Sequence, residues 1–143
     1  LWRPPDFGII KLNFDASFIH ERKLATIAVL ARNYKGEVVG AETYLFEDVV
    51  DAFVVEARAC ERALIFASKM CFQWLAVKGD SLSLDMFFDE VTYSFVSREV
   101  NEVTHVLALE GRRRGVCGSW VNGVLDSVHM VVMKDCLAWD QRV

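Results

Sequence analysis

The sequence predicts a mixed α/β (α+β) fold, in which a β-sheet carries helices on its faces. Three alternating or β-branched runs joined by short loops come first and predict an antiparallel meander of strands. A three-four hydrophobic spacing over residues 51–71 then predicts an amphipathic helix. A short apolar run follows that helix, and a strand entered from a helix is expected to lie parallel to the first strand.

The meander follows an extended lead-in, in which Pro4-Pro5 excludes a helix. Asn33 to Gly36 predicts the hairpin turn between the second and third strands, because Gly36 is suited to a positive φ. The three strands are expected at residues 9–18, 25–32 and 37–46.

Helices are expected in the middle and at the end of the chain. Asp51 is the cap or first-turn acid of the helix over 51–71, and Asn101 caps a second helix that runs to Glu110 and ends at Gly111. The core-facing stripe of the first helix is expected to be Phe53, Ala57, Cys60, Leu64, Ala67 and Cys71. Further strands are expected at 73–79 and 91–96, and a last helix at 124–140.

The length of 143 residues predicts a single domain, 1–143, with a core over about 8–111 and a C-terminal extension over 112–143. The net charge of −4 argues against a strongly basic nucleic-acid clamp, although bound cations would supply positive charge where a phosphate sits. Because the chain starts at Leu1 rather than Met, we expect it to be part of a longer polypeptide.

The cellular compartment is predicted from targeting and metal-binding features that the sequence lacks. No apolar stretch reaches membrane-spanning length, and the N-terminus has no signal-peptide core. No two cysteines have C-x-x-C spacing, which argues against a zinc site and favours buried free thiols in a reducing compartment. We therefore expect a monomeric intracellular protein, nuclear or cytoplasmic, that is neither secreted nor membrane-bound.

Three acidic residues are the candidate functional site. Asp15 closes the first strand, Glu56 lies early in the helix, and Asp80 ends the fourth strand. If the first and fourth strands are adjacent and parallel, the two aspartates face each other and Glu56 reaches them from the covering helix. Carboxylates clustered in this way suit a hard divalent cation such as Mg²⁺. The ordinary alternatives are a solvated strand-end acid, a helix-surface acid and a turn residue.

Motifs that run along nearly the whole chain carry a family resemblance. They are residues 2–5 (WRPP), 10–17 (IKLNFDAS), 31–33 (ARN), 36–41 (GEVVGA), 56–59 (EARA), 63–64 (AL), 79–81 (GDS), 98–101 (REVN) and the tail 119–135. The sequence resembles a type 1 ribonuclease H domain, in the plant version found in retrotransposon-derived reverse transcriptases and in free-standing plant proteins.

The resemblance implies a ribonuclease H-like fold, with a five-stranded mixed sheet in the order 3-2-1-4-5 flanked by helices. It implies hydrolysis of the RNA strand of an RNA–DNA hybrid with two Mg²⁺ ions, for which Mn²⁺ is a substitute. Asp15 would bridge both ions, and Glu56 and Asp80 would hold the ion on the leaving-group side. The partner would be the hybrid or another nucleic acid, recognised by groove shape and 2′-hydroxyl groups.

Two departures from the family pattern bear on activity. His105 occupies the position of the family's fourth acid, and a neutral imidazole suits zinc or iron better than Mg²⁺. Only residues 82–90 separate Ser81 from the fifth strand, so the helix after strand four is expected to be shortened or missing. The rival hypothesis is therefore a catalytically degenerate nucleic-acid-binding or interaction module derived from a retroelement.

The catalytic candidates are thus Asp15, Glu56, Asp80 and His105, of which the three acids are the metal ligands. Ser81, which follows a metal acid, Asn101 and Arg112 are candidate substrate contacts. Arg112 belongs to the tight basic run 112–114, whose arginines suit phosphate contacts, although such a run is more often a solvated loop.

Overall fold

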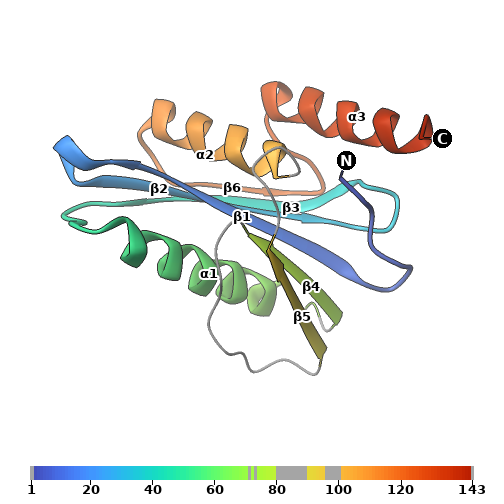
Figure 1. Ribbon diagram of the computed structural model, residues 1–143. Helices are drawn as coiled ribbons and strands as arrows, with labels where there is room; N and C mark the ends of the chain where they lie inside the picture. The colour runs from blue at the N-terminus through green and yellow to red at the C-terminus, as the bar shows by residue number, and fades with distance from the viewer. Residues whose placement is uncertain (1, 71, 73, 80–89, 96–100, 143) are drawn as a thin grey trace.

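The computed structural model describes residues 2–70, 72, 74–79, 90–95 and 101–142, and it gives no side-chain detail for 74–79 and 90–95. The strands are β1 (Ile10–Ile19), β2 (Leu24–Arg32), β3 (Val38–Phe46), β4 (Trp74–Gly79), β5 (Glu90–Phe95) and β6 (Gly118–Val121), and the α-helices are α1 (Ala52–Lys69), α2 (Glu102–Arg114) and α3 (Asp126–Asp140). In this part of the chain the strands form one sheet, with α1 on one face and α2 and α3 on the other (Figure 1).

The mixed sheet is confirmed, and its first five strands have the predicted neighbours. β1 pairs antiparallel with β2 and parallel with β4, β2 pairs antiparallel with β3, and β4 pairs parallel with β5. The prediction of five strands was wrong, because β6 pairs antiparallel with β3 and the order is β5-β4-β1-β2-β3-β6. Four residues are too few to show an alternating pattern, so the pairing with β3 decides this strand. The predicted shortening of the helix after β4 concerns residues 80–89, which lie outside the described residues.

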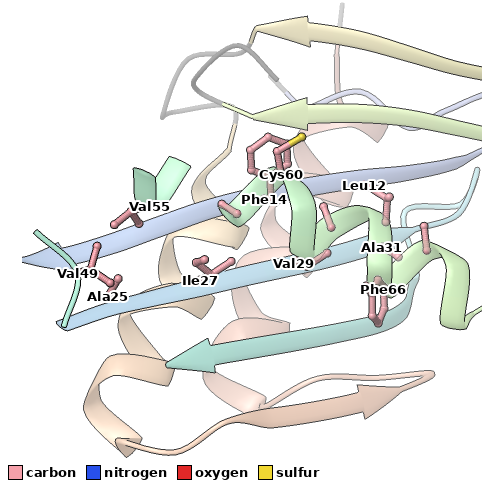
Figure 2. Close-up of a cluster of buried hydrophobic side chains, with 13 residues drawn as sticks. Leu12, Phe14, Ala25, Ile27, Val29, Ala31, Val49, Val55, Cys60 and Phe66 are labelled. Atoms are coloured by element: carbon pink, nitrogen blue, oxygen red, sulfur yellow. The ribbon is translucent and has the colours of Figure 1, made fainter. Parts of the chain in front are cut away.

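Two hydrophobic clusters hold the sheet between its helices. The first lies between the sheet and α1 (Figure 2), and the second lies between the sheet and the pair α2 and α3. β1 separates its side chains accordingly, since Leu12 and Phe14 point into the first cluster. The buried members of the second cluster are Ala28, Leu30, Ala41, Val103, Leu107, Ala108, Val128 and Val132.

The predicted core stripe of α1 needs correction. Asp51 does cap the helix, because its carboxylate accepts a hydrogen bond from Phe53 N at 2.9 Å. Phe53, however, is 80% exposed. It precedes Val55 by two residues, about 200° around the helix, so it points away from the sheet. The stripe that packs on the sheet consists of Val55, Ala59, Cys60, Ala63, Phe66 and Ala67.

Gly111 was predicted to end α2, and this prediction was wrong. The glycine lies inside the helix. The helix continues through Arg114, so the basic run 112–114 is helical rather than a loop, and the helix ends at Gly115 with φ +69°. Gly111 is buried against the sheet, and a Cβ built on it would lie 2.8 Å from Thr26 Cγ2 and 3.0 Å from Thr43 Cβ. A glycine at this point lets α2 approach β2 and β3 closely.

Gly111→Ala is expected to lower the free energy of unfolding by about 1–3 kcal/mol, because the added methyl overpacks the contact between helix and sheet. The higher helix propensity of alanine offsets part of this cost. Urea unfolding followed by circular dichroism measures the effect. Gly123→Ala is the matched control, since its Cβ would meet no atom within 4 Å. A Gly111→Ala protein as stable as this control would contradict the packing role.

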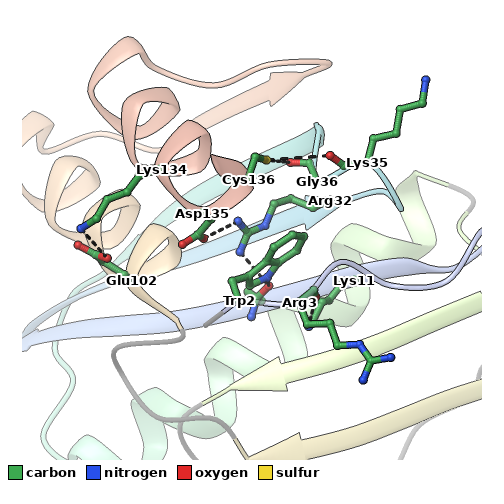
Figure 3. A network of polar contacts seen from close by, with 11 residues as sticks. Trp2, Arg3, Lys11, Arg32, Lys35, Gly36, Glu102, Lys134, Asp135 and Cys136 are labelled. Carbon is green, nitrogen blue, oxygen red and sulfur yellow. Dashed lines mark hydrogen bonds and ion pairs between the residues drawn. The ribbon is translucent and has the colours of Figure 1, made fainter. Parts of the chain in front are cut away.

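A buried polar network joins both ends of the chain to the sheet (Figure 3). The guanidinium of Arg32 is fully buried, pairs with Asp135 of α3 at 2.8 Å and stacks 3.7 Å from the ring centroid of Trp2. Trp2 Nε1 in turn donates to Asn13 Oδ1 of β1 at 3.4 Å. Burial lowers the pKa of Arg32, and Asp135 opposes that shift. The network therefore fixes α3 and the N-terminal segment against the centre of the sheet.

No helix in the described part of the chain is long and apolar enough to cross a membrane.

Candidate active site

The site is built on the polar face of β1. Residues 11, 13, 15 and 17 alternate with the apolar residues that face α1, so their side chains point toward α2 and α3. All four are buried, with exposed fractions of 8% or less. A buried polar group is costly unless it is hydrogen-bonded, and the partners come from the N-terminal segment and from α2. Lys11 Nζ donates to Arg3 O, and Asn13 Oδ1 accepts from Trp2 Nε1. Asp15 Oδ2 contacts His105 Nδ1, and Ser17 Oγ accepts from Arg112 Nη1.

Asp15 and His105 form the central contact. Asp15 Oδ2 lies 2.8 Å from His105 Nδ1, and the Asp15 side chain is 1% exposed against 27% for His105. The structure therefore brings together two of the predicted catalytic residues, Asp15 and His105. The contact with His105 gives this buried carboxyl group a polar partner.

Asn101 sets the position of α2 beside Asp15. It occupies the predicted N-cap position, but its side chain makes no cap hydrogen bond. Its Nδ2 instead donates to the carbonyl oxygen of Phe14, at 2.9 Å. Asn101 is 1% exposed, so its amide anchors the start of α2 to the residue that precedes Asp15. His105 follows one helical turn later and reaches Asp15.

Glu56 belongs to α1, which packs on the face of the sheet opposite to α2. It is half-buried in the second turn of α1, the helix that covers the apolar face of β1. β4 pairs with β1 only from Ile10–Leu75 to Asn13–Lys78, so Asp15 lies two residues beyond that pairing. Asp80 and Ser81 follow β4 directly and lie outside the described residues.

Ser17 is a site residue that the sequence reasoning missed. It is the next residue after Asp15 on the same face of β1, and its Oγ accepts a hydrogen bond from Arg112 Nη1 at 3.1 Å. The signal was present in the alternation, because the second residue after Asp15 on a strand must share its face. Arg112 thus contacts the same strand face as His105, two turns further along α2.

The candidate ligands carry donor atoms of two kinds. Asp15 and Glu56 offer carboxylate oxygens, the hard ligands that Mg²⁺ and Mn²⁺ prefer, whereas His105 offers an imidazole nitrogen. Among the residues that the structure describes, no three His, Cys, Asp or Glu side chains form a group that could hold a metal ion. By donor chemistry the carboxylate of Asp15 suits a hard cation, and the imidazole of His105 does not.

A protein-family model described as reverse transcriptase-like matches residues 13–87, which include Asp15, Glu56 and Asp80. The chain belongs to the reverse transcriptase-like family. No curated protein matches the sequence of this family member.

Solved structures similar to this reverse transcriptase-like chain identify its fold. The RNase H1 of the halophilic archaeon Halobacterium salinarum matches with a TM-score of 0.65 at 19% identity, over 75% of this chain and 99% of the archaeal one. LC11-RNase H1, isolated from compost by a metagenomic approach, matches with a TM-score of 0.62 at 16% identity, over 76% and 99%. The N-terminal RNase H domain of a Mycobacterium tuberculosis protein, solved as a fusion with maltose-binding protein, matches with a TM-score of 0.60 at 16% identity, over 71% and 97%. The chain therefore has an RNase H-like fold.

Proposed function

We propose that this protein hydrolyses the RNA strand of RNA–DNA hybrids in a reaction that depends on divalent cations. The observation that carries the proposal is Asp15, a buried carboxylate on the middle of the sheet of an RNase H-like fold, contacted by α2 at 2.8 Å. The similar solved structures are named as RNase H proteins, which supports the same substrate class. The burial of Asp15 matters because a carboxylate that is not free to rotate in solvent is a pre-organised ligand.

Asp15, Glu56 and Asp80 are the residues that would hold the cations. Bound divalent cations supply a Lewis acid that activates water and stabilises the leaving oxygen of a phosphodiester. The chain itself orients Asp15 through His105 and through the hydrogen bond of Asn101 to Phe14 O. His105 adds no negative charge at the position of the fourth acid, so we propose reduced affinity for a second cation and an impaired rate.

The finer assignments rest on the sequence motifs. Residues 10–17 and 98–101 support membership of the plant, retroelement-associated group of ribonuclease H domains. We propose that the natural substrate is an RNA–DNA hybrid bound by shape, without base specificity, in the nucleus or the cytoplasm. Membership of a longer polypeptide and a monomeric state belong to the same proposal.

A second candidate function is a nucleic-acid-binding module that has lost catalysis. The contact between His105 and Asp15 favours it, because the imidazole already engages one oxygen of the carboxylate that a cation would need. This module would keep the fold and the binding surface and would lack the cleavage step.

The deciding experiment is cleavage of an RNA–DNA hybrid by the purified protein with Mg²⁺, with Mn²⁺ and with EDTA. The RNA strand is labelled in one sample and the DNA strand in another, and double-stranded DNA and double-stranded RNA serve as control substrates. Cutting of the hybrid RNA strand alone, lost with EDTA, is the expected result. A folded protein that binds the hybrid and cuts neither strand with either cation would replace the enzyme by the binding module.

A further inference from the structure

A basic cleft lies beyond the Asp15–His105 pair, where the end of β1 meets the last turns of α2. It encloses about 720 Å³ and is open to solvent. Its lining belongs to β1, to the turn His20–Arg22 between β1 and β2, and to α2. The lining residues are Ile19, Arg22, Leu109, Glu110, Arg112 and Arg113.

The cleft continues the polar face of the site along two elements at once. On β1, residues 15, 17 and 19 share one face, and on α2, residues 105, 109 and 112 follow three-four spacing. Ile19 is four residues beyond Asp15, about 13 Å along an extended strand. The bond from Arg112 to Ser17 Oγ links the cleft to the strand that carries Asp15. A strand of nucleic acid bound at Asp15 would therefore reach the cleft with phosphates a few nucleotides away.

The charge of the cleft is opposite to that of the protein. Three arginines and one glutamate line it, whereas the whole chain has a net charge of −4. Arg113 is paired with Glu110, with Nη2 2.8 Å from Oε2, which leaves Arg22 and Arg112 as the lining arginines that form no ion pair with another described residue. Guanidinium groups suit phosphate oxygens because they donate two parallel hydrogen bonds.

Arginines at the end of a helix also have an ordinary explanation, since cations complement the negative end of the helix dipole. Two observations argue for more than that. Arg112 turns toward β1 and donates a hydrogen bond to Ser17 Oγ. Arg22 belongs to a different element, so the dipole of α2 does not explain its presence in the same cleft.

We propose that Arg22 and Arg112 bind backbone phosphates of the nucleic-acid strand a few nucleotides from the one positioned at Asp15. This inference rests on the proposed function, because it assigns a second contact region to the same substrate. It predicts that the cleft contributes to affinity in a salt-dependent way and does not select bases.

The test measures binding of a labelled RNA–DNA hybrid by fluorescence anisotropy at several salt concentrations in EDTA, so that no cleavage occurs. Each of Arg22→Gln and Arg112→Gln is expected to weaken binding and to reduce the slope of log K against log salt by about 0.9. Arg142→Gln, which removes the same charge from an exposed residue beyond α3, is the matched control and should leave the slope unchanged.

The outcomes separate this inference from the proposed function. If the parent protein binds the hybrid and both cleft variants keep its affinity and slope, the cleft inference is wrong and the proposed function stands. If the parent protein binds no nucleic acid, both the cleft inference and the proposed function are wrong. Arg22 is exposed in a turn, so its variant tests the cleft even if the loss of the Arg112–Ser17 bond unfolds the other one.

Discussion

Asp15→Asn is expected to abolish cation-dependent cleavage of the RNA–DNA hybrid. The substitution keeps the size of the side chain and an oxygen that can accept from His105, but it removes the negative charge that attracts a divalent cation. The loss should exceed the roughly 10–100-fold that removal of an outer-shell partner costs at metal sites, because Asp15 is proposed as a direct ligand. Initial cleavage rates with Mg²⁺ and with Mn²⁺ measure it.

The same variant should bind the hybrid at least as tightly as the parent protein in EDTA. One carboxylate fewer beside the phosphate backbone reduces like-charge repulsion, so tighter binding with lost cleavage would indicate a residue that faces the substrate. Asp140→Asn, at the exposed end of α3, removes the same charge and should change neither quantity. Parental cleavage rates in a folded Asp15→Asn protein would remove Asp15 from the proposed site.

The central part of this fold was predictable because each signal was local. The alternation along β1 indicates both an apolar and a polar face, and the spacing along α1 indicates a helix. β6 was not predictable, since four residues acquire a strand conformation only by pairing with the edge of β3. Gly111 was predicted as a helix end for a similar reason. Its packing role depends on Thr26 and Thr43, which are distant in sequence.

The candidate site residues stay predictions, and the structure adds contacts among them that the sequence did not indicate. The sequence suggested Asp15 and His105 as separate positions, and the structure adds their 2.8 Å contact. Asn101 was expected to cap α2, but its amide bonds Phe14 O, which a cap preference does not indicate. The burial of the polar face of β1 depends on where α2 and α3 pack, and an alternating strand with one polar face is just as compatible with solvent on that side.

His105→Asp is expected to raise the cleavage rate by at least about 10-fold, because a change in an outer-shell partner alone alters activity at metal sites by roughly 10–100-fold. The variant restores an acid at the family's fourth position and removes the imidazole that engages Asp15 Oδ2. In EDTA the two carboxylates face each other and repel, so the variant should melt at a lower temperature than the parent protein. Mg²⁺ should then stabilise it by about 2.7 kcal/mol at 100 times its Kd.

His105→Asn is the matched control for this gain. It has the size of aspartate and also removes the imidazole, but it adds no charge, so it separates the release of Asp15 from the addition of a hard ligand. Thermal melting with and without Mg²⁺ and hybrid cleavage are measured for both variants. Equal rates and equal Mg²⁺ stabilisation in the two variants would show that the missing charge at this position does not limit the protein. A gain in cleavage rate and in Mg²⁺ stabilisation that is confined to His105→Asp would instead show that the imidazole in place of a carboxylate causes the impairment.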